Sequence, residues 1–318
     1  MRGFGVESAE ASLFSHRLEP IGRILEDRHY HVWCCSPIYD EEGKVHVFFS
    51  RWPLDAGHEG WLKVSEIAHA VADEPGGPYK VLGTVMTGRK GKAWDAATIH
   101  NPTVQKIGSK YAMFYLGNSD GTVHTQRIGL AIADSLYGPW SRVGNEPILD
   151  VSEDKGMWDS YITVNPALLQ HQDGQFWLYY KAWDRYNDNM RKMGVAIAKH
   201  IEGPYIKHPA NPLVDFSCIP AEAEDAYVFE ENGKYHMLMR DMGVFSERGG
   251  IYLESEDGLQ WSQPTIGYYP SHYYFDEPEY RFERPQVLMR NGTPAYLFLA
   301  LMGWNGQRSS GAVLKIQK

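Results

Sequence analysis

The chain has 318 residues, of which 43% are apolar and 13% aromatic, so it is not an intrinsically disordered chain. Lys and Arg total 31 against 40 Asp and Glu, a formal net charge of −9, which argues against nucleic acid or an anionic membrane as a partner. The longest apolar run, residues 295–302, falls well short of the roughly 18 residues of a membrane span. Three cysteines form neither a disulfide framework nor a zinc pattern.

Residues 1–30 form an N-terminal extension, and residues 8–25 within it carry the one clear signal for a short helix. From residue 31 onward, one pattern of a polar residue, an apolar stretch, a turn and an aromatic-rich stretch occurs five times. The five copies begin at Ser36, Asn101, Asn165, Glu224 and Glu283. Pro37, Pro102 and Pro166 are spaced by 65 and 64 residues, which indicates a repeat of about 60 residues.

A second motif lies between these segments at a similar period. Gly-Pro-aromatic corners recur at Gly77, Gly138 and Gly203, and a shortened copy ends the chain. Each unit contains four apolar stretches of strand length separated by turn residues, and helix signals are nearly absent. The sequence therefore predicts an all-β, five-bladed β-propeller with four-stranded blades over residues 31–318. We expect residues 1–30 to help close the ring; a two-sheet sandwich is the alternative, and the regular period argues against it.

The inner strands of a propeller converge at one mouth, so their first residues should resemble one another unless some have a function. The fourth and fifth copies carry Glu224, Asp225 and Glu283 where earlier copies carry Asn. A carboxylate near a crowded axis is unfavourable unless something uses it, and paired carboxylates are what glycoside hydrolysis requires. The structural alternative is that these acids only pair with Arg240, Arg281 or Arg284.

Basic and aromatic residues end the second strands of the copies, which should return to the same mouth. Trp can stack on a sugar ring and Arg or Lys can bind its hydroxyls or a carboxylate, although Arg stacked on Trp is also a structural pair. The predicted substrate-binding residues are Arg51, Trp52, Asn101, Asn165, Lys181, Trp183, Glu224, Arg240, Arg284 and Trp304.

Three further residues are candidates for acid–base chemistry. Asp95 follows Trp94 six residues before Asn101, and a similar Trp-Asp pair at Asp159 suggests a turn-forming role as the alternative. His100 adjoins the predicted mouth, and His272 lies in an aromatic, acidic loop that leads into Glu283. Histidine titrates near neutral pH, and a hydrogen-bonded structural role is the alternative for both.

The Pro-led inner strands, the Gly-Pro-aromatic corners, the segment EDAYVFEENGKYHM and the later FERPQ resemble the five-bladed propeller glycosidases of families 43, 32, 62 and 117, most closely family 117. The resemblance covers residues 31–318. In these families a first-blade Asp before Pro is the general base, a second Asp tunes pKa values and a Glu is the general acid. The resemblance implies that Asp225 is the residue that tunes pKa values and that Glu283 is the general acid. Ser36 stands where the base is expected, so Asp95, Asp159, His100 or His272 would replace it, Asp95 foremost.

We therefore expect an enzyme of polysaccharide degradation: an exo-acting glycoside hydrolase that releases a terminal anhydro- or uronic-type sugar from plant or algal oligosaccharides. The alternatives are a glycoside phosphorylase, a polysaccharide lyase or a non-catalytic carbohydrate-binding propeller. No cofactor or metal is predicted, since nothing specifies a channel Ca²⁺, and oligosaccharide is the expected partner, with a homodimer left open. The first residues lack a signal-peptide core, so we expect a cytoplasmic protein unless a removed signal made it periplasmic or secreted.

Overall fold

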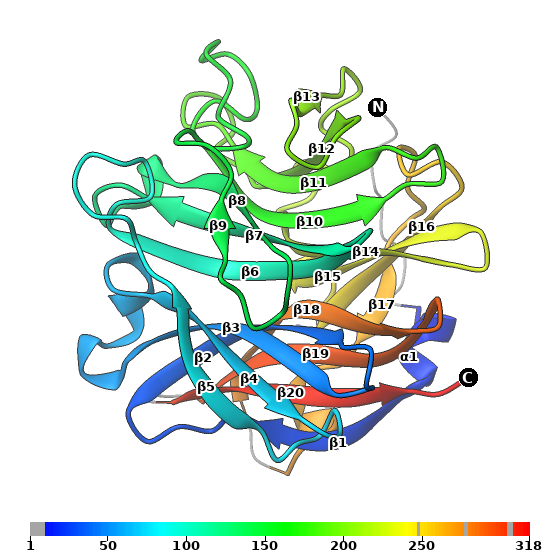
Figure 1. Ribbon diagram of the computed structural model, residues 1–318. Helices are drawn as coiled ribbons and strands as arrows, with labels where there is room; N and C mark the ends of the chain where they lie inside the picture. The colour runs from blue at the N-terminus through cyan, green and yellow to red at the C-terminus, as the bar shows by residue number, and fades with distance from the viewer. Residues whose placement is uncertain (1–9, 247–248, 277–278, 304–307) are drawn as a thin grey trace.

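The computed structural model describes residues 10–246, 249–276, 279–303 and 308–318. They form five four-stranded antiparallel sheets arranged as the blades of a propeller, which confirms the predicted all-β fold (Figure 1). Blade one comprises β2 (Tyr30–Tyr39), β3 (Val45–Pro53), β4 (Glu66–Ala72) and β5 (Lys80–Met86). Blade two comprises β6 (Thr98–Ile107), β7 (Lys110–Asn118), β8 (Arg127–Ala133) and β9 (Ser141–Arg142). Blade three comprises β10 (Ile162–Gln170), β11 (Phe176–Trp183), β12 (Lys192–Ala198) and β13 (Ile206–Lys207).

Blade four comprises β14 (Glu222–Glu231), β15 (Lys234–Met242), β16 (Gly250–Ser255) and β17 (Thr265–Tyr268). Blade five is built from both ends of the chain, because β18 (Glu279–Arg290), β19 (Thr293–Gly303) and β20 (Ser309–Ile316) are joined by β1 (Leu18–Ile24). In Figure 1 the blue β1 lies beside the red β20, and Leu18 pairs with Ile316. The described helices are α1 (Leu13–His16) and four short 3₁₀ turns, η1 (Leu54–Ala56), η2 (His58–Leu62), η3 (Val123–Thr125) and η4 (Ser271–Tyr273).

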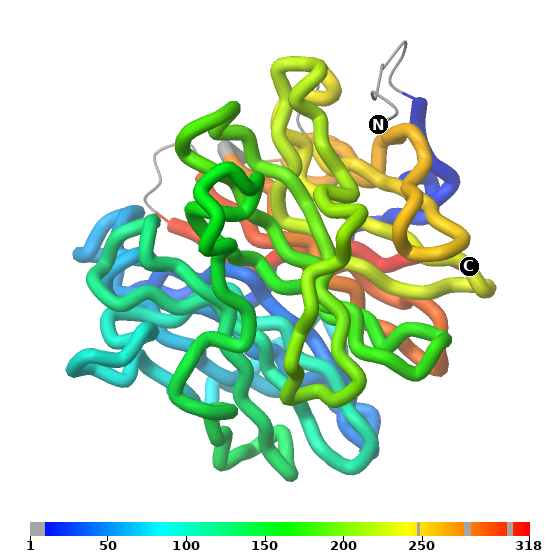
Figure 2. The backbone as a smooth tube through the Cα atoms, turned by 90° about the horizontal axis from the view of Figure 1, so that it is seen from above, coloured from blue at the N-terminus to red at the C-terminus, as the bar shows by residue number. Residues whose placement is uncertain are grey.

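The hydrophobic core lies between neighbouring blades. Buried apolar residues of adjacent sheets form a cluster at each of the five junctions, including the junction of blades one and five that closes the ring. At that junction Phe298 and Val313 of blade five pack with Val47 and Phe49 of blade one. Figure 2 shows the orange-red blade five between blade four and the blue blade one. Sheets that pack face to face in this way bury the apolar side of every strand.

Every inner strand carries a bulge at the same position. The strand register skips two residues there, and the first of them has a positive φ between 50° and 60°. These five equivalent residues are Cys34, Asn101, Asn165, Asp225 and Arg284. Asn and Asp tolerate this left-handed conformation better than most residues, which suits three of the five positions.

The bulges correct the predicted alignment of three blades. Glu224 and Glu283 are equivalent to His100 and Val164, one residue before the bulge, and not to Asn101 and Asn165 as the sequence suggested.

Blade one is shifted further. The proline spacing aligned Ser36 with Asn101, but Ser36 pairs with Phe48 just as Thr103 pairs with Phe114, so Ser36 is equivalent to Thr103. Cys34 is therefore the counterpart of Asn101. The proline spacing gave the wrong alignment because Pro102 directly follows its bulge residue, whereas Pro37 lies two positions further from Cys34.

Among the residues that the structure describes, no helix is long and apolar enough to cross a membrane.

Candidate active site

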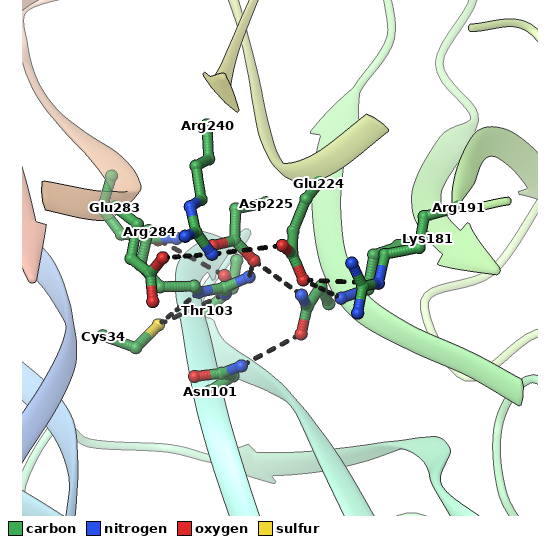
Figure 3. Close-up of polar contacts among 12 residues, drawn as sticks. Cys34, Asn101, Thr103, Lys181, Arg191, Glu224, Asp225, Arg240, Glu283 and Arg284 are labelled. Atoms are coloured by element: carbon green, nitrogen blue, oxygen red, sulfur yellow. Dashed lines mark hydrogen bonds and ion pairs between the residues drawn. The ribbon is translucent and has the colours of Figure 1, made fainter. Parts of the chain in front are cut away.

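The five bulge residues meet around the propeller axis and are linked by hydrogen bonds. Figure 3 labels four of them, Cys34, Asn101, Asp225 and Arg284. Arg284 Nη1 donates to Asp225 Oδ1 at 3.0 Å, and Asn165 Nδ2 donates to the same oxygen at 2.7 Å. Asn101 Nδ2 donates to Asn165 Oδ1 at 3.0 Å. Arg284 also reaches Cys34 Sγ at 3.3 Å, and that thiol donates to the Pro102 carbonyl of blade two at 3.5 Å. We call these five residues, one from each blade, the axial ring.

A cavity of about 120 Å³, open to solvent, lies at the axial ring. Its lining includes the residue just before each ring residue, one from each blade: Trp33, His100, Val164, Glu224 and Glu283. Four ring residues and eight further residues from strands and loops complete it: Asn101, Asn165, Asp225, Arg284, Trp52, His58, Trp61, Leu116, Gln126, Lys181, Arg240 and Arg281. Every blade therefore contributes to a single pocket.

Glu283 is a buried carboxyl group at this cavity, with 4% of its surface exposed. It contacts Arg240 Nη1, and Arg281 Nη1 lies 3.4 Å away. Burial raises the pKa of Glu283 to about 7; Arg240 opposes this rise, and the negative charges of Asp225 and Glu224 add to it. Near neutral pH this carboxyl group can hold a proton and give it up, as a general acid must.

Glu224 has the opposite character. Burial would raise its pKa, but Lys181, Arg191 and Arg240 outweigh that effect and hold the pKa well below its usual range. Its carboxylate accepts a hydrogen bond from Lys181 Nζ at 2.6 Å, and Arg240 Nη1 and Arg191 Nε lie at 3.3 and 3.9 Å. Arg240 Nη1 thus contacts both glutamates, so a carboxyl group with a raised pKa and an ionised carboxylate flank one nitrogen (Figure 3).

Another part of the cavity wall is aromatic and uncharged. His100 accepts or donates at Nδ1 with Ser65 Oγ at 2.8 Å, and its ring packs against Trp52 and Trp61. Burial, together with Arg284 and His58, holds the pKa of His100 well below its usual value, so this ring is neutral at pH 7. Indole faces beside polar groups are the surfaces on which sugar rings bind.

The buried polar atoms of the lining that have no hydrogen-bond partner within the described ranges include Asn101 Oδ1, Gln126 Nε2 and His58 Nδ1. Buried polar atoms are nearly always paired, so unpaired ones at a cavity indicate a ligand or ordered water that would pair them. Gln126 and Asn101 are 3% and 6% exposed, which makes the missing partners energetically significant.

The structure gathers most of the predicted site residues at the cavity. Those that line it are Glu283, Asp225, His100, Trp52, Asn101, Asn165, Lys181, Glu224, Arg240 and Arg284. Arg51 instead donates to Glu66 at 2.7 Å, and Trp183 lies under Lys181 and Arg191 without lining the cavity. His272 is exposed on η4, away from the lining. Trp304 lies outside the described residues.

Asp95 is also away from the cavity, contrary to its predicted role as replacement base. It is buried in blade two, where it contacts Arg89, Arg142 Nε at 2.8 Å and Tyr115 Oη at 3.0 Å. Asp159 makes the equivalent contacts in blade three, with Tyr180 and Lys207. A carboxylate that repeats with its tyrosine partner is part of the blade architecture, which explains why the Trp-Asp pair recurs in the sequence.

Seven lining residues were not predicted as site residues: Trp33, His58, Trp61, Leu116, Gln126, Val164 and Arg281. Trp33 would have been found by aligning blade one on Cys34, since it then matches Glu224 and Glu283. His58, Trp61 and Gln126 lie in or beside loops outside the repeated strands, where the repeat carries no positional information. No group of three or more His, Cys, Asp or Glu side chains that could hold a metal ion occurs in the described part of the chain.

No protein-family model matches the chain. A probable arabinan endo-1,5-alpha-L-arabinosidase C from Neosartorya fischeri is 30% identical over 134 residues, 40% of this chain and 37% of that protein. A probable arabinan endo-1,5-alpha-L-arabinosidase A from Aspergillus oryzae is 28% identical over 117 residues, 36% of each chain. The chain thus matches less than two-fifths of the length of these curated relatives.

Solved structures match over nearly the whole chain. A family 117 glycoside hydrolase from the marine bacterium Zobellia galactanivorans superimposes with a TM-score of 0.74 at 18% identity, over 94% of this chain and 90% of that one. The GH43_1 enzyme from Xanthomonas citri, complexed with xylotriose, has a TM-score of 0.63 at 16% identity, over 93% and 90% of the chains. The chain therefore has the five-bladed fold of the family 117 and family 43 glycoside hydrolases, as the sequence motifs predicted.

Proposed function

We propose that this protein is a glycoside hydrolase that removes a terminal sugar from an oligosaccharide. The observation that carries the proposal is the pair of glutamates at the cavity, Glu283 with a pKa of about 7 and Glu224 ionised. Two carboxyl groups whose pKa values are driven apart are the mark of acid-catalysed glycosidic cleavage. The fold and the arabinanase relatives support the same class of reaction.

In the proposed reaction Glu283 protonates the glycosidic oxygen of the leaving group. Positive charge then develops on the sugar ring, and the ionised Glu224, which shares Arg240 Nη1 with Glu283, stabilises that charge. Arg240 keeps the two side chains in place through Nη1. Trp61 offers a surface for the sugar, and Asn101 Oδ1 can accept a hydrogen bond from a hydroxyl group.

The charge of the lining supports a terminal sugar that carries a carboxylate, as a uronic-type sugar does. Lys181, Arg240, Arg281 and Arg284 are four cations, and with Glu283 protonated only Glu224 and Asp225 are anions. An excess of positive charge in a chain with a net charge of −9 favours an anionic ligand at this place. Because all five blades contribute to a single pocket, its shape suits the end of a sugar chain, which supports exo action. Plant or algal oligosaccharides are the proposed substrates.

The test is a screen of plant and algal oligosaccharides, neutral and uronic, with released monosaccharide detected by chromatography. The wild type should release one terminal sugar per cleavage. Glu283→Gln should lower kcat/KM by about 10²–10⁴-fold, the usual contribution of a general acid. Glu66→Gln is the matched control, because Glu66 also pairs with an arginine but lies outside the cavity. Full activity of Glu283→Gln, or no release from any substrate, would contradict the proposal.

A further inference from the structure

We propose that His58 is the general base that activates water in this cavity. The inference rests on the proposed function, since a base is needed only if water cleaves the glycosidic bond. In a single-displacement hydrolysis one group protonates the leaving oxygen while a second takes a proton from the attacking water. Glu283 fills the first role, and the structure leaves the second to be assigned.

The carboxylates of the cavity are poorly suited to that role. Glu224 is surrounded by Lys181, Arg191 and Arg240, which hold its pKa far down and so make it a weak proton acceptor. Asp225 accepts hydrogen bonds from both Arg284 and Asn165 through Oδ1, within the axial ring. The cavity residue that matches Glu224 and Glu283 in blade one is Trp33, which has no titratable group.

His58 is the imidazole of the lining that is free to accept a proton. It lies half-buried at the start of η2, and its buried Nδ1 has no hydrogen-bond partner among the described residues. His100, by contrast, is fully buried, and its Nδ1 is bonded to Ser65. A polar side chain without partners that lines a cavity points to a ligand, here water or the sugar.

The chain holds His58 in place from both sides. Gly57, with φ of 65°, lets the backbone turn immediately before it, and Trp52 Nε1 donates to the Gly57 carbonyl at 2.9 Å. Lys63 N donates to the Gly60 carbonyl at 3.0 Å at the end of η2. Because Trp52 belongs to the inner hairpin of blade one, His58 is held against a blade that, like blades two and three, contributes no acidic residue to the cavity.

The titratable groups around His58 lie on strands β18, β2 and β6 and on η2 itself. Burial lowers its pKa, Arg281 of β18 lowers it further, and the neighbouring Glu59 of η2 raises it in part. His31 of β2 and His100 of β6 also interact with it, and burial lowers the pKa of each of them as well. His58 is therefore neutral at pH 7, the form that accepts a proton. Arg281 also contacts Glu283, so the acid and the base are influenced by one guanidinium.

The step balances as an ordinary hydrolysis. The water oxygen attacks the anomeric carbon as the bond from that carbon to the leaving oxygen breaks. His58 takes one proton from the water, and Glu283 gives its proton to the leaving oxygen. Afterwards His58 releases its proton to solvent and Glu283 regains one, so the enzyme returns to its starting state.

The test compares His58→Asn with His272→Asn, a matched control in which an exposed histidine outside the cavity is changed. With the oligosaccharide that the wild type cleaves, His58→Asn should lower kcat/KM by about 10²–10⁴-fold, and His272→Asn should not. The fall in wild-type activity on the acid side of the pH profile, where His58 becomes protonated, should disappear in His58→Asn. Thermal unfolding of both variants confirms that they are folded.

Two further readouts separate a base from an acid. An aryl glycoside of the released sugar, whose leaving group needs no protonation, should restore most activity to Glu283→Gln but none to His58→Asn. Nuclear magnetic resonance of freshly released sugar should show inversion of anomeric configuration. A wild type that hydrolyses substrate with retention, or a His58→Asn variant with unchanged rate and pH profile, would overturn the role of His58 alone. A wild type that releases no sugar would overturn the proposed function and this role with it.

Discussion

Arg284 Nη1 lies 3.0 Å from Asp225 Oδ1, and this ion pair joins blade five to blade four at the propeller axis. Both side chains are almost entirely buried. The same aspartate oxygen accepts a hydrogen bond from Asn165, and Arg284 reaches on to Cys34, so one pair connects four blades. The geometry of the cavity therefore depends on this buried charge pair, whose two residues also line the cavity.

Replacing Arg284 with Met should lower the free energy of unfolding by about 3–5 kcal/mol, because the Asp225 carboxylate would remain buried without its cation. Chemical denaturation followed by tryptophan fluorescence measures this change. The double variant Arg284→Met with Asp225→Asn should recover part of the loss, since no charge is then left unpaired. A single variant as stable as the wild type would show that water or another cation replaces the guanidinium.

The pH dependence of catalysis should report the carboxyl group of Glu283. Its pKa is raised to about 7, so it is protonated below that pH and loses its proton as the pH rises through it. Activity that needs the protonated form should therefore decline above about pH 7. Because Arg240 opposes the rise, Arg240→Met should move this decline to higher pH, whereas Arg51→Met, outside the cavity, should leave it in place. A decline at the same pH in both variants would assign it to another group.

A variant of Gln126 tests whether an unpaired donor in the cavity lowers the stability of the fold while it contributes to substrate binding. Its buried Nε2 has no partner within the described residues, a situation that costs about 1–3 kcal/mol. Gln126→Met keeps the shape and removes the unpaired donor, so it should raise the melting temperature while it increases KM for the substrate. Gln105→Met is a suitable control, because Gln105 Nε2 already donates to the Leu168 carbonyl and its loss should destabilise. Unchanged KM in Gln126→Met would mean that the donor does not meet the sugar.

The fold could be predicted from the sequence because the blades repeat. Turn residues and apolar stretches recur at a nearly constant period, and local hairpins dominate the topology, so few long-range pairings had to be inferred. The exception is the pairing of β1 with β20, which joins the two ends of the described chain and has no repeat signal of its own. The expectation that the N-terminal extension closes the ring came from the incomplete last unit.

The site was predictable where a residue departs from the repeat, as Glu224, Asp225 and Glu283 do. It was not predictable where the repeat itself was misaligned, because the bulge at Cys34 lies two residues before the proline that suggested the alignment. Loop residues such as His58 lie outside any repeated element, and only their three-dimensional placement brings them to the cavity. Asp95 shows the opposite error, in which a repeated acid was given a function that the repetition itself argued against.

Asp95 should therefore behave as a structural residue when it is replaced. Its carboxylate is fully buried between Arg89 and Arg142 and accepts a hydrogen bond from Tyr115, so Asp95→Asn would leave two arginines without their counter-ion. We expect a loss of about 3–5 kcal/mol in the free energy of unfolding, the usual effect of breaking a buried pair. The kcat of the folded protein, measured well below its melting temperature, should stay within about twofold of the wild type, since the residue does not reach the cavity. Asp159→Asn, the equivalent change in blade three, should give the same pattern. A 10²-fold or greater loss of kcat in Asp95→Asn at unchanged stability would instead return this residue to the catalytic machinery.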